Sequence, residues 1–180
     1  MKYLLLLLAV LFGFAFHSGL ALPDQVAPDQ SSVTFSMKHL GGTVTGTFSG
    51  MEGSVIFDEN NLAGSSMDVS LDAKSIDTKN RARDSDLRGK KFFDVENHPR
   101  IRFRSIGIIK APEGGYQVRG QLTIKDVTRE EIIPFKVEKQ GDASVFTGSF
   151  IVNRKNYNLG KSSFPPIGKE AKVEIKAIVK

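Results

Sequence analysis

Histidine is the residue type best suited to acid–base chemistry here, and only three histidines occur in 180 residues. Cysteine is absent, which excludes thiol nucleophiles, thiolate zinc sites and disulfide frameworks. His39 and His98 lie far apart with no acidic spacing motif, so they give little support for a metal site. There is no Gly-x-Ser-x-Gly elbow, and carboxylates stand singly or beside basic residues. We therefore expect a protein without a catalytic residue, a metal site or a cofactor.

Alternation of apolar and polar residues continues through most of the chain after Leu22, as is typical of half-buried strands. There are about nine such runs, at residues 33–37, 44–48, 55–57, 67–71, 101–103, 116–124, 133–137, 146–152 and 173–179. Turn-forming residues at 41–42, 59–61, 112–115 and 140–142 separate several of them. Short connections favour antiparallel neighbours, so we predict an all-β domain of antiparallel strands.

One segment, residues 79–88, breaks the alternation. Opposite charges lie three positions apart in it, Arg81 with Asp84 and Arg83 with Asp86, which favours a short exposed helix that Gly89 ends. The chain shows no internal repeat, low-complexity stretch or linker. We therefore predict a single domain over residues 22–180 that contains one short helix.

The first 21 residues have a basic start, an uncharged run from Leu4 to Phe16, and small residues at Gly19 and Ala21. This pattern is typical of a signal peptide cleaved near Ala21. The apolar run is shorter than the roughly 20 residues that span a bilayer as a helix. We expect residues 22–180 to be periplasmic or secreted, while retention of the segment as an anchor stays open.

The inward faces of the predicted strands are rich in phenylalanine, at positions 35, 48, 57, 103, 135, 146 and 150. Inward glycines at 46, 120 and 148 would bend the strands or leave room inside. About eight strands that close into a barrel either fill the interior with side chains or hold one small ligand. A hollow, almost wholly apolar wall would select a long apolar chain. A filled barrel would instead serve as an envelope stress or protein-interaction module, and the pattern does not choose between these readings.

Three arginines, Arg100, Arg102 and Arg104, share one face of a predicted strand, opposite Ile101 and Phe103. This face is either simply solvated or a contact with an anionic membrane surface. The formal net charge of the chain is only +5, much less than the dense positive charge by which basic segments bind nucleic acids. We therefore expect no nucleic-acid partner. The sequence leaves a homodimer open.

Seven groups of residues follow one another in an order that resembles the YceI-like family of exported, lipocalin-like polyisoprenoid-binding proteins. They are Ser32, Phe35, Lys38 and His39; Gly46, Phe48 and Gly50 with Gly53, Phe57 and Asp58; residues 75–78; Arg83, Asp84, Leu87 and Arg88; residues 92–95 with Pro99 and Phe103; Gly120 and 122–124 with Val127 and Thr128; and Asn153, Arg154, Tyr157 and Gly160. The resemblance covers roughly residues 26–180.

The resemblance implies an extended eight-stranded antiparallel lipocalin-like barrel with one short helix, a tunnel for a long isoprenoid or similar lipid, and no catalytic site. It also implies that Asp77, Arg83, Asp84, Asn153 and Arg154 are scaffold contacts. Combined with the inward parity of the strands, it predicts a ligand-binding wall with His39 available to the polar head of the lipid. The predicted wall consists of Phe35, Met37, His39, Phe48, Met67, Val69, Phe103, Leu122, Phe135, Phe146 and Phe150.

Overall fold

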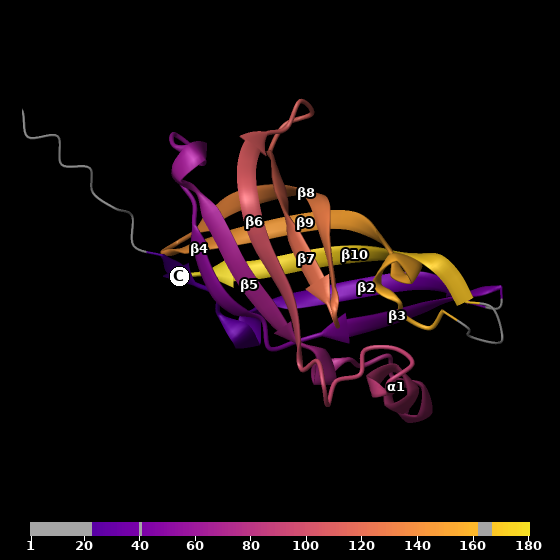
Figure 1. The fold of residues 1–180 in the computed structure, drawn as a ribbon. Coiled ribbons are helices and arrows are strands. Elements are labelled where there is room, and N and C mark those ends of the chain that lie inside the picture. Colours follow the sequence, from indigo (N-terminus) through magenta and orange to yellow (C-terminus); the bar gives the residue numbers. More distant parts are fainter. Residues whose placement is uncertain (1–22, 40, 162–166) are drawn as a thin grey trace, which may run out of the picture.

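The computed structural model describes residues 23–39, 41–161 and 167–180, so the predicted signal peptide lies outside the described residues. The described chain forms one curled antiparallel sheet of ten strands with a single α-helix (Figure 1). The strands are β1 (Asp24–Gln25), β2 (Ser32–His39), β3 (Gly42–Phe48), β4 (Glu52–Ile56), β5 (Ser66–Asp72), β6 (Arg100–Lys110), β7 (Tyr116–Ile124), β8 (Val127–Gln140), β9 (Ala143–Asn153) and β10 (Ile167–Val179). The helices are α1 (Arg81–Arg88) and four 3₁₀ turns, η1 (Pro28–Gln30), η2 (Leu62–Gly64), η3 (Ala73–Ser75) and η4 (Arg154–Tyr157).

The predicted count of eight strands is wrong, because the described sheet has ten. Each of the nine alternating runs corresponds to one strand, from β2 to β10, although the run 55–57 ends one residue beyond β4. The tenth strand, β1, has only two residues, which is too short to show an alternation. Strand β8 also starts at Val127, before its predicted run, because Lys125 adopts a φ of 57° and turns the chain tightly out of β7.

The sheet runs in the order β1-β4-β5-β6-β7-β8-β9-β10-β2-β3. Residues beside β1 bond to both β4 and β10: Val26 N donates to Gly53 O at 3.0 Å, and Ala27 N donates to Ile178 O at 2.8 Å. The segment around β1 therefore links β4 to the end of β10. At the other edge of the sheet, β3 pairs with β2, and Thr47 of β3 also forms a bridge with Asp77.

The predicted helix is confirmed as α1, and its ends follow from two residues. The side chain of Asn80 accepts a hydrogen bond from Arg83 N, which caps the amino end, and Gly89 caps the carboxyl end. In Figure 1, α1 lies on the opposite side of the molecule from the C-terminus. The helix therefore stands beside one end of the curled sheet.

Two inward glycines, Gly46 and Gly120, pack directly against phenylalanine rings from the neighbouring strands. A Cβ atom on Gly46 would lie 2.5 Å from the ring of Phe35, and one on Gly120 would lie 2.4 Å from the ring of Phe103. The room that these glycines leave is therefore taken up by the rings, which pack against the glycine of the adjacent strand. The inner face of the sheet is packed at these two positions, while the space that the sheet curls around stays open.

Candidate functional site

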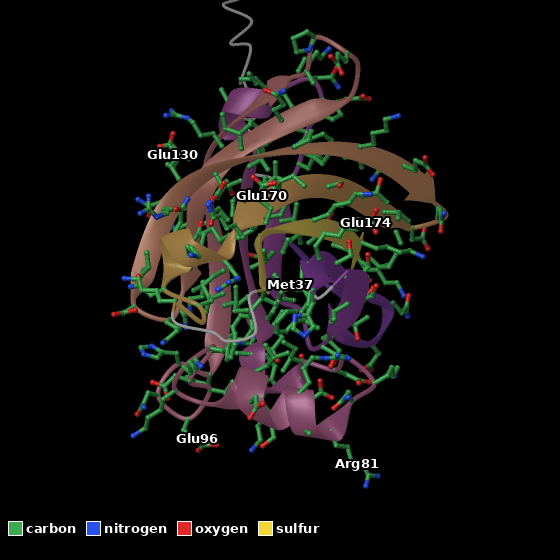
Figure 2. All side chains as sticks on the ribbon, turned by 90° about the vertical axis from the view of Figure 1, so that its right-hand side faces the viewer. Met37, Arg81, Glu96, Glu130, Glu170 and Glu174 are labelled. Carbon is green, nitrogen blue, oxygen red and sulfur yellow. The ribbon has the colours of Figure 1, made fainter. Side chains whose placement is uncertain are left out.

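The inside of the curled sheet encloses a cavity of about 820 Å³. The inward side chains of β2 to β10 form its wall, because inward positions recur at every second residue of each strand. In Figure 2, Met37 lies inside the curve of the sheet, whereas Glu130 lies on its outer side. The hollow alternative left open by the sequence pattern is therefore the one that the structure adopts.

All eleven residues predicted for the ligand-binding wall line this cavity. They are Phe35, Met37, His39, Phe48, Met67, Val69, Phe103, Leu122, Phe135, Phe146 and Phe150. Their exposure differs along the cavity: Phe103, Leu122, Phe135 and Phe146 are buried, but Phe35 and Met37 are only half-buried. Contact of these side chains with a ligand stays a prediction.

One end of the cavity is open and has a polar rim. The half-buried end of β2 lines it on one side, and exposed residues in and after α1, among them Asp86, Lys90 and Lys91, line it on the other. In Figure 2, α1 lies below the curled strands and carries Arg81 on its outer side. A molecule with an apolar tail and a polar head could therefore place its head at this rim.

His39 stands at this rim with an unsatisfied ring nitrogen. Its Nδ1 atom is buried and makes no hydrogen bond to any described residue. The imidazole lines the cavity, and its strand position pairs with Ile167 of β10. A buried polar atom without a partner is costly, so a ligand that supplies a hydrogen bond here would be favoured.

A polar network fixes α1 beside the opening. The buried carboxylate of Asp84 accepts hydrogen bonds from the backbone N and the hydroxyl of Thr78, at 2.8 and 2.5 Å. Arg83 donates to the same threonine, and Arg88 donates to the carbonyl oxygens of Lys74 and Ile76. These contacts agree with a scaffold role for Arg83 and Asp84, since both side chains point into the protein framework.

Arg154 holds the two chain segments that flank the opening. Its guanidinium donates to the carbonyl oxygens of Leu159, Gly160, Ile167 and Gly168 at 2.6 to 3.1 Å. Only 5% of the residue is exposed, and this burial lowers the pKa of Arg154. The side chain also lines the cavity. Arg154 therefore ties the chain after η4 to the start of β10.

A second buried polar contact supports the same region. Tyr157, in η4, is fully buried, and its hydroxyl donates to Glu131 of β8 at 2.7 Å. Burial and this hydrogen bond raise the pKa of Tyr157 well above its ordinary value. The segments around the opening are therefore held by the buried polar contacts of Arg154 and Tyr157, whereas the cavity wall is mostly apolar.

The other end of the cavity is blocked by aromatic rings. Phe135 and Phe146 line the cavity, and Phe57 and Tyr116 pack against them from behind. Phe57 meets the ring of Phe146 at 5.5 Å and that of Tyr116 at 4.9 Å, both edge to face. We call Phe57, Tyr116, Phe135 and Phe146 the ring plug.

The three arginines of β6 lie on the outer face, as predicted, and two of them meet acids, one on β4 and one on β5. Arg100 donates to Glu52 at 2.9 Å and to the hydroxyl of Ser70, and Arg104 lies 3.8 Å from Asp68. These pairs reduce the positive charge that this face presents. Contact of the face with an anionic membrane stays a prediction.

The described residues contain no cluster of three or more histidine, aspartate or glutamate side chains that could hold a metal ion. His98 lies apart from His39, with its Nε2 atom 4.0 Å from the carboxylate of Asp94. No described helix has the length and apolar character to cross a membrane.

Some of the cavity wall was missed in the sequence. Leu87, Phe92 and Phe93 come from α1 and the loop after it, yet they line the cavity, and Phe93 packs on Phe48 at 5.4 Å. The segment has no alternation, so strand parity could not assign an inward side. The apolar residues Leu87, Phe92 and Phe93 within a charged stretch were the available signal.

Comparison with known proteins assigns the family. A sequence model of the YceI-like domain matches residues 25–179, which is nearly the whole described chain. The chain belongs to the YceI-like family. Among curated proteins, this YceI-like chain is 36% identical over 111 residues to a UPF0312 protein of Yersinia pestis (strain Pestoides F) and 37% identical over 111 residues to one of Yersinia enterocolitica. Each match spans 61% of this chain and 57% of the relative.

Solved structures share the YceI-like fold. BcnA of Burkholderia cenocepacia superposes with a TM-score of 0.80 at 24% identity, covering 86% of this chain and 99% of BcnA. A polyisoprenoid binding domain from Saccharophagus degradans gives a TM-score of 0.71 at 11% identity, covering 89% of this chain and 99% of that one. The Campylobacter jejuni YceI protein gives 0.64 at 23% identity, covering 79% and 90%. At these identities the likeness shows the fold of the YceI-like chain.

Proposed function

We propose that this protein binds a long apolar-chain lipid, an isoprenoid or a similar molecule, inside the curled sheet and carries or sequesters it in water. The observation that carries the proposal is the apolar cavity of about 820 Å³ with one polar rim. A cavity of this size is within the range that small ligands occupy. The protein would act as a binding protein, with no chemical step.

Exclusion of water from the tail would supply the affinity. Each buried methylene contributes about 0.8 kcal/mol, so a tail that buries about ten of them gains roughly 8 kcal/mol before the entropy losses of binding. The wall around Phe103 and Leu122 is mostly apolar, with Val69, Val118 and Ile133 among its members. Such a wall would select for apolar length and shape, which suits a linear lipid.

The polar head would lie at the rim, where His39 has an unpartnered nitrogen and the exposed side chains after α1 include Lys90 and Lys91. The isoprenoid class is supported by the fold that this chain shares with the polyisoprenoid binding domain from Saccharophagus degradans. A tail of this class is long, apolar and linear, as the cavity requires.

We also propose that the protein works outside the cytoplasm after cleavage near Ala21, because residues 1–21 have the pattern of a signal peptide. Arg102, between the two paired arginines of β6, is the exposed residue through which this face would contact an anionic membrane. A homodimer is compatible with lipid binding and is tested by the mass of the native protein.

The test uses two neighbouring residues of β7 that point in opposite directions. Leu122 is buried and lines the cavity, whereas Gln121 is exposed on the outer face. We expect the purified unmodified protein and the Gln121→Asp variant to yield an apolar lipid on organic extraction and mass spectrometry. The Leu122→Asp variant should yield none, because a carboxyl group in the wall would lose its hydration without gaining a hydrogen bond when an apolar tail covers it.

Because Leu122→Asp could unfold the protein, a second wall variant is placed at the half-buried Val69, and the fold of each variant is checked by circular dichroism. Folded Val69→Asp protein that carries as much lipid as Gln121→Asp would overturn the proposal. So would unmodified protein that yields no lipid and binds no added isoprenoid alcohol, which would favour an envelope protein-interaction module.

A further inference from the structure

The ring plug draws together side chains from four separate strands or strand ends. Phe57 directly follows β4, Tyr116 begins β7, Phe135 lies in β8 and Phe146 in β9. The ring centroids of Tyr116 and Phe135 lie 5.4 Å apart, and those of Phe135 and Phe146 lie 6.0 Å apart, each pair stacked at 29°. Phe57 meets all three of the other rings edge to face, within 5.9 Å. Mutual packing of this kind favours one arrangement of the rings.

The plug has an inner and an outer layer. Phe135 and Phe146 are each 7% exposed and line the cavity. Phe57 and Tyr116 do not line it and stand on the far side of these two rings. The hydroxyl of Tyr116 reaches outward to the carboxylate of Glu59 at 3.5 Å. The two layers therefore separate the end of the cavity from the turn after β4, which is exposed to solvent.

The plug stands far from the rim that holds His39. Along β10, Ile167 pairs with His39, and Ala177, ten residues later, pairs with Phe146. With a rise of about 3.3 Å per residue and a strand tilt of roughly 40°, the distance along the cavity is roughly 25 Å. A tail whose head stays at the rim would reach the plug with its last atoms.

We propose that the ring plug limits the length of the ligand. The packing of Phe57 behind Phe135 and Phe146 sets the longest tail that the cavity accepts. This inference rests on the proposed function and adds a limit on tail length to it. A tail that ends at the plug buries all of its surface. A longer tail must either displace packed rings or leave its extra carbons in water, so its affinity stops rising.

The experiment measures the dissociation constants of linear isoprenoid alcohols that differ by one five-carbon unit, using delipidated full-length protein and displacement of a fluorescent lipid. For the unmodified chain we expect affinity to rise with length up to a limit and then to level off or fall. In Phe57→Ala the limit should move up by at least one unit. Within that variant, the first alcohol beyond the old limit should bind at least about tenfold better relative to the alcohol at the limit.

Three variants serve as controls. Phe146→Trp adds bulk on the inner layer and should move the limit down. Tyr116→Phe keeps the ring and loses only the hydroxyl that reaches Glu59, so the limit should not move. Phe57→Leu replaces Phe57→Ala if the latter does not fold, and it should move the limit in the same direction.

The outcomes separate the two proposals. If no alcohol binds the unmodified chain, the proposed function fails. If the alcohols bind and the limiting tail length is the same in the unmodified chain, Phe57→Ala and Phe57→Leu, the lipid site stands. The proposal that the plug limits tail length is then overturned. Affinity that keeps rising with length in the unmodified chain would overturn it as well.

Discussion

Inward apolar side chains line both ends of the cavity, but they are buried at one end and only half-buried at the other. At the ring plug, Phe135 and Phe146 are buried and stacked. At the rim, Phe35 and Met37 have the same inward parity but are half-buried, because the wall beside them is completed by α1 and its loop. The two ends therefore differ in how far their inward side chains are buried, although the ring of Phe35 also lies 5.7 Å from that of Phe48.

The largest expected contrast is in stability. Phe135→Ala removes a buried ring from the plug and should lower the free energy of unfolding by about 3–5 kcal/mol. Phe35→Ala removes a half-buried ring at the open end and should cost about 1–2 kcal/mol. Urea denaturation followed by circular dichroism measures both values. Equal losses would show that the two ends do not differ in packing.

The next contrast concerns Arg154, which supports the open end from inside the protein. Arg154→Met leaves four carbonyl oxygens without their donor and should cost about 3 kcal/mol of stability. Lys155→Met, at the exposed neighbouring position, should change stability by less than about 0.5 kcal/mol. The thermal midpoints of the two variants check this. A loss for Arg154→Met as small as that for Lys155→Met would refute the tie between η4 and β10.

One tyrosine at each end allows the comparison to be made by pH. Burial and Glu131 raise the pKa of Tyr157, and burial and Glu59 raise the pKa of Tyr116. The folded protein holds these protons more tightly than the unfolded chain does. Stability is therefore complete below the unfolded pKa of about 10 and falls as the pH rises above it towards the folded pKa.

The two phenylalanine variants separate these contributions. Tyr157→Phe should cost about 2 kcal/mol at neutral pH, because the hydrogen bond to Glu131 is lost, and should reduce the alkaline loss of stability. Tyr116→Phe should have a smaller effect on both, since its contact with Glu59 is long and exposed. Absorbance of ionised tyrosine during alkaline titration, recorded beside unfolding curves, measures this. A normal pKa for Tyr157 would contradict the structure.

The smallest expected contrast is in the stability of variants at Gly46 and Gly120, the two glycines that pack against phenylalanine rings. Gly120→Ala should cost about 2 kcal/mol, because the added methyl group would meet both the buried ring of Phe103 and the carbonyl oxygen of Arg104. Gly46→Ala should cost about 1 kcal/mol, because the added methyl group would meet the half-buried ring of Phe35, which can move towards the opening, and the side-chain Cγ2 atom of Thr78, at 2.8 Å. Differential scanning calorimetry resolves this difference, and the reverse order would mean that the rim is the more tightly packed end.

The sequence predicts the wall of this cavity well but not the cavity itself. Strand parity placed the inward residues correctly because side chains alternate strictly between the faces of a sheet. The same parity holds for Phe57 in the plug and Phe35 at the rim, so it could not show which rings each of them would contact. That outcome depends on which strands curl opposite each other, and this is a property of the whole sheet.

Residues outside the strands were harder to predict. The contribution of Leu87 and Phe93 to the wall depends on where Asp84 and Arg88 fix α1 against the chain before it, and these are contacts that no periodic pattern reveals. Strand β1 escaped notice because two residues cannot show a period, although the segment around it joins β4 to β10. The family resemblance supplied the tunnel, but its count of eight strands did not transfer.

The central claim is that the space inside the sheet holds an apolar tail. Native mass spectrometry of the unmodified protein, purified without detergent and compared with the denatured polypeptide, tests it most directly. We predict an added mass that organic extraction removes, that belongs to an apolar lipid, and that returns when an isoprenoid alcohol is supplied. A native mass equal to that of the polypeptide, unchanged after addition of the alcohol, would contradict the claim.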